Sequence, residues 1–166
     1  MSQRGFTLIE LLITLLIATI IAVMTVPAFS DFLTRQQLSA DVNEMVSVLS
    51  FARSEAIKQR QNVTVEFLPP GECGGLEGMV EDKDSLRWCY GVKSEEETMR
   101  VGRTANITMP DQTFSLTFLN LGDANIDKCS SPCHITLSPQ RLLEEEASIT
   151  LAINITGSIR RKDLEL

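Results

Sequence analysis

The sequence is poor in the residue types from which most active sites are built. It has one histidine, one tryptophan and one tyrosine among 166 residues, and aromatic residues make up only 5% of the chain. The single histidine, His134, follows Cys133, and no nucleophile–base set is visible around it. The sequence also lacks a glycine-rich phosphate loop and a dinucleotide fingerprint. We therefore expect no enzyme, no catalytic residues and no cofactor.

Positive charge is scarce as well. Acidic residues outnumber basic ones by 22 to 15, and the formal net charge is −7. This balance argues against general binding to nucleic acids or anionic membranes, although it leaves room for a local basic patch. No low-complexity tract occurs, and the part beyond residue 30 is long enough for one domain with a modest core.

What the sequence does contain is a long apolar run near its start. No residue from Leu11 to Phe29 is charged, and as a helix this run measures about 28 Å, close to the hydrocarbon thickness of a bilayer. Arg4 before the run and Asp31 after it orient the N-terminus toward the cytoplasm. We expect residues 6–29 to form a single retained membrane span, with the C-terminal part outside the cytoplasm.

Glu10 is the exception in this apolar region. A carboxylate near the start of a spanning helix costs up to about 3 kcal/mol on insertion scales, and such residues usually mark a function. A simpler alternative places Glu10 at headgroup depth on the first helical turn, where the helix dipole favours an acidic side chain.

The stretch RGFTLIELL, residues 4–12, resembles the leader junction of type IV pilins and type II secretion pseudopilins. The resemblance implies that a prepilin peptidase removes residues 1–5 by cutting after Gly5 and then methylates the new N-terminus, Phe6. It further implies that Glu10 pairs with the N-terminal amine of a neighbouring subunit. Such a pair would fix the register between otherwise uniform apolar helices.

A second helical pattern follows the apolar run. No Gly or Pro interrupts residues 30–61, and apolar residues recur there every three or four positions. One helix is therefore predicted from Phe6 to about Gln61, amphipathic in its second half. Pro27 lies inside it; the pilin resemblance implies a kink or a melted stretch there, and a plain kink at the membrane surface is the alternative. The predicted apolar stripe consists of Leu38, Val42, Met45, Leu49, Ala52 and Ala56.

The end of this helix carries a second resemblance. The stretch ARSEAIKQR, residues 52–60, is similar to a signature of the GspH/FimT family of minor pilins and pseudopilins. Its alanines would allow close approach to a sheet. Arg53 and Glu55 are expected to make exposed ion pairs that contribute little to stability.

After Asn62 the pattern changes to short runs of β-branched and aromatic residues separated by turn residues, which predicts strands. The stretches RWCYGVK (87–93) and ITGSIRR (155–161) resemble the tryptophan-containing strand and the last hairpin of the GspH/FimT family. The predicted fold is α+β, the pilin fold, with one long N-terminal helix packed on a C-terminal antiparallel β-sheet domain at residues 62–166. The predicted strands are Val63–Leu68, Leu86–Val92, Ile107–Met109, Phe114–Leu119, Ile135–Leu137, Ile149–Ile155 and Ser158–Arg161.

Four cysteines in a part of the chain outside the cytoplasm suggest disulfides. Three pairings are possible, and proximity favours Cys73 with Cys89 and Cys129 with Cys133. A zinc site at Cys129, Cys133 and His134 is the alternative, although adjacent extended residues point in opposite directions. The spacing Asp123-x-Asn125-x-Asp127 is like the start of a calcium loop, but it lacks the glycine and the bidentate glutamate that such a loop needs. We expect no metal site.

Three cations, Arg160, Arg161 and Lys162, follow Gly157 near the C-terminus. Some FimT-like pilins have Gly-Arg-x-Arg at this place and bind DNA through it. Here Ser158 replaces the first arginine, and Arg160 matches the second. Three neighbouring cations could contact two or three phosphates with salt-sensitive affinity. A solvated end or a subunit contact is the alternative.

These resemblances imply a minor pilin that primes or caps a type IV pilus used for twitching motility, adhesion or DNA uptake. They imply assembly with other minor pilins and a major pilin, and contact with the prepilin peptidase and an inner-membrane assembly platform. The expected location is the bacterial inner membrane, with a periplasmic C-terminal domain, and then the filament or its tip. Two alternatives remain open: a GspH-like minor pseudopilin of type II secretion, and a DNA-binding pilin for natural transformation.

Overall fold

A computed structural model describes residues 7–79, 87–95, 97–104, 107–108, 113–125, 133–139 and 148–163. The chain divides into two compact units, Met1–Thr34 and Arg35–Leu166. We call them the N-terminal unit and the globular unit and describe each separately.

Helix α1 spans Leu8–Gln59 and is capped at its start by Thr7. The Glu10 amide donates to Thr7 Oγ1 at 3.3 Å, and the Leu11 amide donates to the Thr7 carbonyl at 3.2 Å. The helix ends at Gln59, because the next residue, Arg60, has a left-handed φ of 55° that stops the helical path. The prediction of one continuous helix is confirmed, with both ends about two residues shorter than predicted because local capping sets them.

The part of α1 in the N-terminal unit carries exposed apolar side chains all round. Leu8 is 78% exposed and Val23 is 75% exposed. Among the residues that the structure describes, no helix reaches the combination of length and hydropathy that a membrane crossing requires. The helical backbone continues through Pro27.

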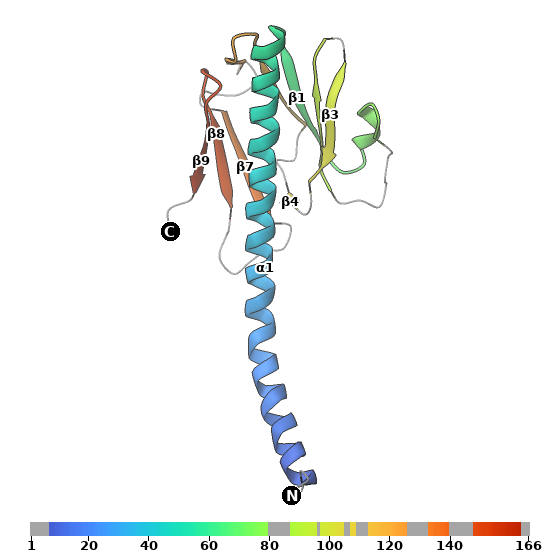
Figure 1. Cartoon of the computed structure of the whole chain (residues 1–166), viewed down its shortest axis with the longest axis vertical. Helices are drawn as coiled ribbons and strands as arrows, with labels where there is room; N and C mark the ends of the chain where they lie inside the picture. The colour runs from blue at the N-terminus through green and yellow to red at the C-terminus, as the bar shows by residue number, and fades with distance from the viewer. Residues whose placement is uncertain are drawn as a thin grey trace, which may run out of the picture. The chain divides into compact units, whose positions relative to one another are not determined.

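The part of α1 in the globular unit is one-sided. Its buried face packs against two antiparallel sheets, as Figure 1 shows. Every residue of the predicted stripe is at most 4% exposed, and Val48 joins it. The buried face is Leu38, Val42, Met45, Val48, Leu49, Ala52 and Ala56.

The first sheet has five strands in the order β3-β2-β1-β5-β6, and the second has four in the order β4-β7-β8-β9. All neighbours pair antiparallel. The predicted α+β architecture, a long helix packed on antiparallel sheets, is therefore confirmed. The strands are β1 (Val63–Leu68), β2 (Cys89–Lys93), β3 (Thr98–Arg103), β4 (Ile107–Thr108), β5 (Phe114–Phe118), β6 (Ala124–Asn125), β7 (Cys133–Pro139), β8 (Ile149–Ile153) and β9 (Ile159–Asp163).

Alternation along the strands builds the core. In β1, residues 63, 65 and 67 are fully buried, while their neighbours are half-buried. The same period of two places Leu151 and Ile153 of β8 in the core. Buried side chains from both sheets meet the apolar face of α1 in one cluster.

The sequence did not predict β3 or β6. Strand β3 has only two alternating apolar residues, Met99 and Val101, before Gly102 and Arg103 end the pattern, which is too short a signal. It is held by pairing with β2, by Met99 and Val101, which pack on the main and the second core, and by Arg100, whose guanidinium lies 5.9 Å from the ring centroids of Phe51 and Tyr90. Strand β6 is two residues long, too short for a periodic signal.

A flap covers the outer face of the first sheet. It consists of residues 71–79, including the short 3-10 helix η1 (Cys73–Gly75), and a disulfide joins Cys73 to Cys89 of β2. Leu76 lies so close to Gly91 that a Cβ there would meet Leu76 Cδ2 at 2.6 Å. The flap therefore forms a small second core with β2 and β3.

Candidate functional site

The first candidate is the start of α1. Glu10 lies on the first turn, exposed among exposed apolar side chains, and Thr7-x-x-Glu10 is the pattern of a capping box. An acid here faces the positive end of the helix dipole. The predicted cleavage and methylation residues, Gly5 and Phe6, lie outside the described residues.

The second candidate is the far end of α1, where Arg53 joins the two sheets. Its Nε donates to the Gly122 carbonyl at 3.0 Å, and its Nη2 donates to the Thr156 carbonyl at 2.9 Å. The expected exposed ion pair is found for Glu55, whose carboxylate accepts from Lys58 at 3.1 Å and from Gln59 at 2.9 Å, whereas Arg53 donates to the two carbonyls instead. Because both partners of Arg53 are backbone carbonyls, no sequence pattern indicated them.

Two glycine turns make these contacts possible. Gly122 ends the β5–β6 turn at φ 86°, and Gly157 ends the β8–β9 turn at φ 70°. A Cβ on Gly157 would collide with the Gly122 carbonyl and would lie 2.8 Å from Arg53 Nε. Both positions therefore need glycine, for backbone conformation and for space.

The third candidate is the basic end of the chain, which forms the edge strand β9. Arg160 pairs with Ala152 and Lys162 with Thr150, so both side chains share the outer face of the sheet with His134 and Thr136. Arg161 pairs with Leu151 and belongs to the opposite face. The three predicted cations are neighbours in sequence, but the strand places two of them on one face of the sheet and the third on the other.

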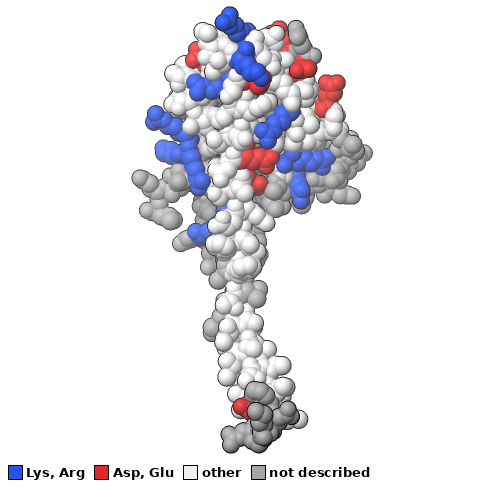
Figure 2. All heavy atoms as spheres, viewed as in Figure 1, with Lys and Arg blue, Asp and Glu red and all other residues white. Residues whose placement is uncertain are grey.

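Figure 2 shows several Lys and Arg side chains along the side of the globular unit where Figure 1 places β9. The local basic patch that the net charge left open is therefore present at this sheet edge. Arg160, Arg161 and Lys162 of β9 are all exposed, and the register places Arg160 and Lys162 on its outer face.

The cysteines follow the favoured pairing as far as the structure describes them. Cys73 and Cys89 form a disulfide, and Cys133 is disulfide-bonded too. Cys129 lies outside the described residues. Within the described part of the chain no group of His, Cys, Asp or Glu is arranged to hold a metal ion. Asp123 of the calcium-like spacing closes the β5–β6 hairpin through its carbonyl, and Asp127 lies outside the described residues.

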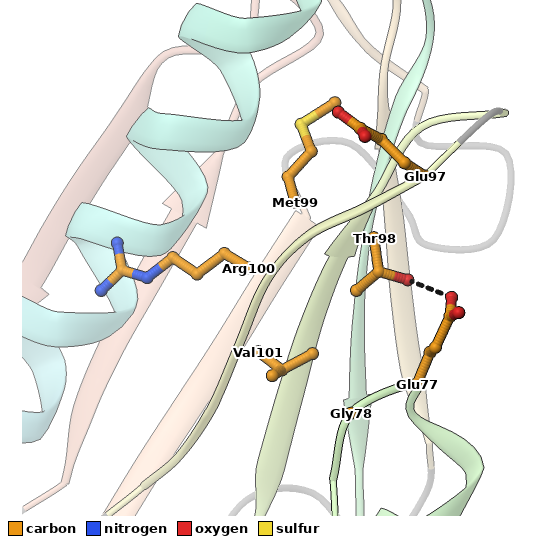
Figure 3. Close-up of a pocket in the computed structure, with 7 residues that line it drawn as sticks. All are labelled: Glu77, Gly78, Glu97, Thr98, Met99, Arg100 and Val101. Atoms are coloured by element: carbon orange, nitrogen blue, oxygen red, sulfur yellow. Dashed lines mark hydrogen bonds between the residues drawn. The ribbon is translucent and has the colours of Figure 1, made fainter.

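A pocket of about 340 Å³ lies between the flap and β3. Figure 3 shows Glu77 and Thr98 pointing toward each other, and the Thr98 hydroxyl donates to Glu77 Oε2 at 3.3 Å. Arg100 points away, toward α1. The lining residues include two carboxylates but no histidine or cysteine, so this pocket offers no nucleophile–base pair.

Tyr90 has the one strongly shifted pKa among the described groups that show a resolved shift. Burial, and then the hydrogen bond of 2.7 Å that its hydroxyl donates to Glu44 Oε1, raise the pKa of Tyr90 to about 12. A tyrosine with this pKa stays neutral at physiological pH, so the group ties β2 to α1 rather than serving as a base.

Two family models match the chain. One, described as the prokaryotic N-terminal methylation motif, matches residues 1–26; the other, described as type II transport protein GspH, matches residues 41–157. The N-terminal motif and the helix-on-sheets fold define a type IV pilin-like protein. Within this class the chain belongs to the GspH family, since that match covers more than half of its length.

Relatives agree with this assignment. A fimbrial protein of Dichelobacter nodosus is 32% identical over 108 residues, 62% of this chain and 59% of that protein. A fimbrial protein of Pseudomonas aeruginosa is 37% identical over 68 residues, 41% of this chain and 44% of that protein. The chain thus spans between 44% and 59% of the length of these relatives.

A solved structure shows the same fold. The crystal structure of the type IV minor pilin FimU of Pseudomonas aeruginosa matches with a TM-score of 0.52 at 19% identity, covering 77% of this chain and 90% of that one. The resemblance to the GspH/FimT family is therefore confirmed by the family model, and the solved structure shows the same fold.

Proposed function

We propose that the chain is a minor type IV pilin that primes or caps a pilus. The prepilin peptidase would cut after Gly5 and methylate Phe6, and residues 6–29 would hold the subunit in the bacterial inner membrane before assembly. The uncharged run of residues 11–29 supports the anchor. The observation that carries the proposal is an exposed carboxylate, Glu10, on the first turn of α1, in a stretch from Leu8 to Ser30 that carries no other charge.

In this proposal Glu10 sets the register of assembly. A carboxylate buried in a bundle of apolar helices is costly unless it meets a cation, and the methylated amine of a neighbouring subunit is the one that processing supplies. Only the subunit registers that bring Glu10 close to this amine avoid the cost of burying an unpaired carboxylate. Pro27 would let the helix bend or unwind as the subunit leaves the membrane.

The test compares Glu10→Gln with Asp31→Asn, which removes an exposed carboxylate from the same helix. Glu10→Gln should reach the membrane fraction in normal amount but enter filaments poorly, whereas Asp31→Asn should assemble like the wild type. Filament incorporation of Glu10→Gln at the wild-type level would contradict the register role.

The main alternative is a minor pseudopilin of type II secretion, which the description of the matching family model favours. Curated relatives described as fimbrial proteins favour the pilus. Purifying surface filaments and secretion complexes from the same cells, and locating the chain in one of them, decides between the two.

DNA binding is the second alternative, and the shared outer face of Arg160 and Lys162 supports it. Two cations on one face would give weak, salt-sensitive binding without base readout. Arg160→Ala combined with Lys162→Ala should abolish binding to duplex DNA at low salt. Arg161→Ala, on the other face, is the matched control and should retain it; no binding by the wild type at low salt excludes this role.

A further inference from the structure

One end of the globular unit carries an apolar surface that folding does not explain. Among its described residues, three large apolar side chains are exposed: Ile57 at 48%, Leu121 at 78% and Ile155 at 56%. Single exposed apolar residues are common on soluble domains, but these three come from three separate elements. We call them the tip platform.

Contacts between their elements place these three residues near one another. A Cβ on Gly122, the residue after Leu121, would lie 2.6 Å from Ile57 Cδ1. The Ala124 amide, just beyond the same turn, donates to the Ile155 carbonyl at 2.8 Å. The β5–β6 turn, the β8–β9 turn and the last turns of α1 therefore meet at one place.

The two turns are built in the same way. The Gly122 amide donates to the Leu119 carbonyl at 2.7 Å, and the Gly157 amide donates to the Asn154 carbonyl at 2.8 Å. Each glycine has a positive φ, as in a type I turn that ends in a G1 bulge. Such turns favour Asn, Asp, Ser and Gly at their tips, so turn formation does not explain why Leu121 and Ile155 occupy these positions.

Arg53 fixes the platform before any partner arrives. Its guanidinium bonds to one carbonyl in each turn, which locks the two tips relative to α1. A rigid apolar surface binds at a lower entropic cost than a mobile one.

We propose that the tip platform docks against the apolar helix of a neighbouring pilin-type subunit in the same filament. This inference rests on the proposed function. Three side chains cannot supply the roughly 1,000 Å² of total buried area that a free protein partner needs for stable binding. The partner must therefore be held nearby by a second contact, and an assembled bundle of N-terminal helices provides that local concentration.

The chain's own fold indicates the chemistry of the partner surface. Pilin-type subunits carry an N-terminal helix with exposed apolar side chains, here from Leu8 to Leu33. In a filament this surface must be covered by other subunits, and the tip platform is the matching apolar surface on the globular unit. Burying Leu121 and Ile155 against such a helix removes both apolar surfaces from water.

The test uses the full chain in cells that assemble filaments. A photo-cross-linking residue is placed at Leu121, with Thr136, exposed on the outer face of β7, as the control position. The expected result is a cross-link from position 121 to the N-terminal helix of another pilin-type subunit, mapped by mass spectrometry, and none to that helix from position 136. Cross-links to a globular domain alone, or equal cross-linking from both positions, overturn the proposal.

Substitution gives an independent measurement. Leu121→Ser with Ile155→Ser should lower filament incorporation by about tenfold or more relative to Asn120→Ser, a change in the same turn, with the unfolding midpoint of the detergent-solubilised chain unchanged. Incorporation of the double variant at the control level overturns the inference but leaves the proposed function intact. Absence of the wild-type chain from every filament overturns both.

Discussion

Arg53 and Thr156 lie 103 residues apart in sequence, yet the guanidinium of Arg53 donates a hydrogen bond of 2.9 Å to the Thr156 carbonyl. The same guanidinium donates at 3.0 Å to Gly122, from the edge of the other sheet. One side chain on α1 therefore connects a turn of each sheet. This contact is the least predictable feature of the domain and the one with the clearest consequences for stability.

Replacing Arg53 should destabilise the domain. Arg53→Met removes two charged donors and leaves two backbone carbonyls unpaired, so we expect a loss of about 1–3 kcal/mol in the free energy of unfolding. Arg53→Lys should rescue little, because an ammonium lacks the planar fork that reaches both carbonyls. Urea denaturation of the full chain in detergent measures the effect, with Arg60→Met as a control on an exposed cation. If Arg53→Lys were as stable as the wild type, this would contradict the stabilising role of the two hydrogen bonds that the guanidinium donates.

Gly157→Ala should be more damaging than an ordinary glycine substitution. A left-handed alanine costs about 1 kcal/mol or more, and here its Cβ also meets the Gly122 carbonyl. Gly71→Ala is the matched control, since Gly71 has a φ of 90° but nothing within 4 Å of the added Cβ. Thermal unfolding should show a clearly larger drop for Gly157→Ala. Equal losses would mean that only backbone strain matters at Gly157.

Removing the Cys73–Cys89 disulfide should loosen the flap. The sequence separation is 16, for which loop entropy predicts a loss of about 3 kcal/mol. Hydrogen exchange in the variant with both cysteines changed to serine should rise at residues 73–79 and around Gly91, beneath Leu76. The strands β7–β9 lie in the other sheet and serve as the internal reference. Unchanged exchange throughout would show that packing alone holds the flap.

Alkaline pH should test the contact between Tyr90 and Glu44. The folded pKa of Tyr90, about 12, lies above its unfolded value near 10. The neutral hydroxyl therefore stabilises the fold fully below about pH 10, and this contribution is lost as the pH rises through about 12. Because the chain has one tyrosine, the ultraviolet absorbance of tyrosinate reports this group alone. Glu44→Gln should lower the observed pKa; an unchanged titration would contradict the assigned contact.

The elements that periodic burial controls were predictable from the sequence. The apolar stripe of α1 and the strand Val63–Leu68 follow from spacings of three to four and of two. Strand β3 was missed because its apolar alternation is only two residues long, Met99 and Val101, and its pairing with β2 and the contacts of Arg100 leave no periodic pattern. The basic end was found as three adjacent cations, but only the strand register shows that Arg161 belongs to the other face.

Among the site residues, too, some were indicated by the sequence and others were not. Glu10 stood out because a charge interrupts an apolar run. Arg53 did not stand out, since its partners are carbonyls that every residue possesses. The tip platform was not predicted, because Ile155 was assigned to the strand Ile149–Ile155, whereas β8 ends at Ile153 and Ile155 lies exposed in the turn that follows.

The bonds of Arg53 also impose an order on folding during synthesis. The helix end that carries Arg53 leaves the ribosome early, but its second partner, Thr156, belongs to the last hairpin. Until that hairpin emerges, the second sheet lacks its closing edge and the guanidinium has only one of its carbonyls. The globular unit therefore completes its fold only after Ile159–Asp163 has been synthesised, and a polypeptide cut short before β9 would remain an open, protease-sensitive intermediate.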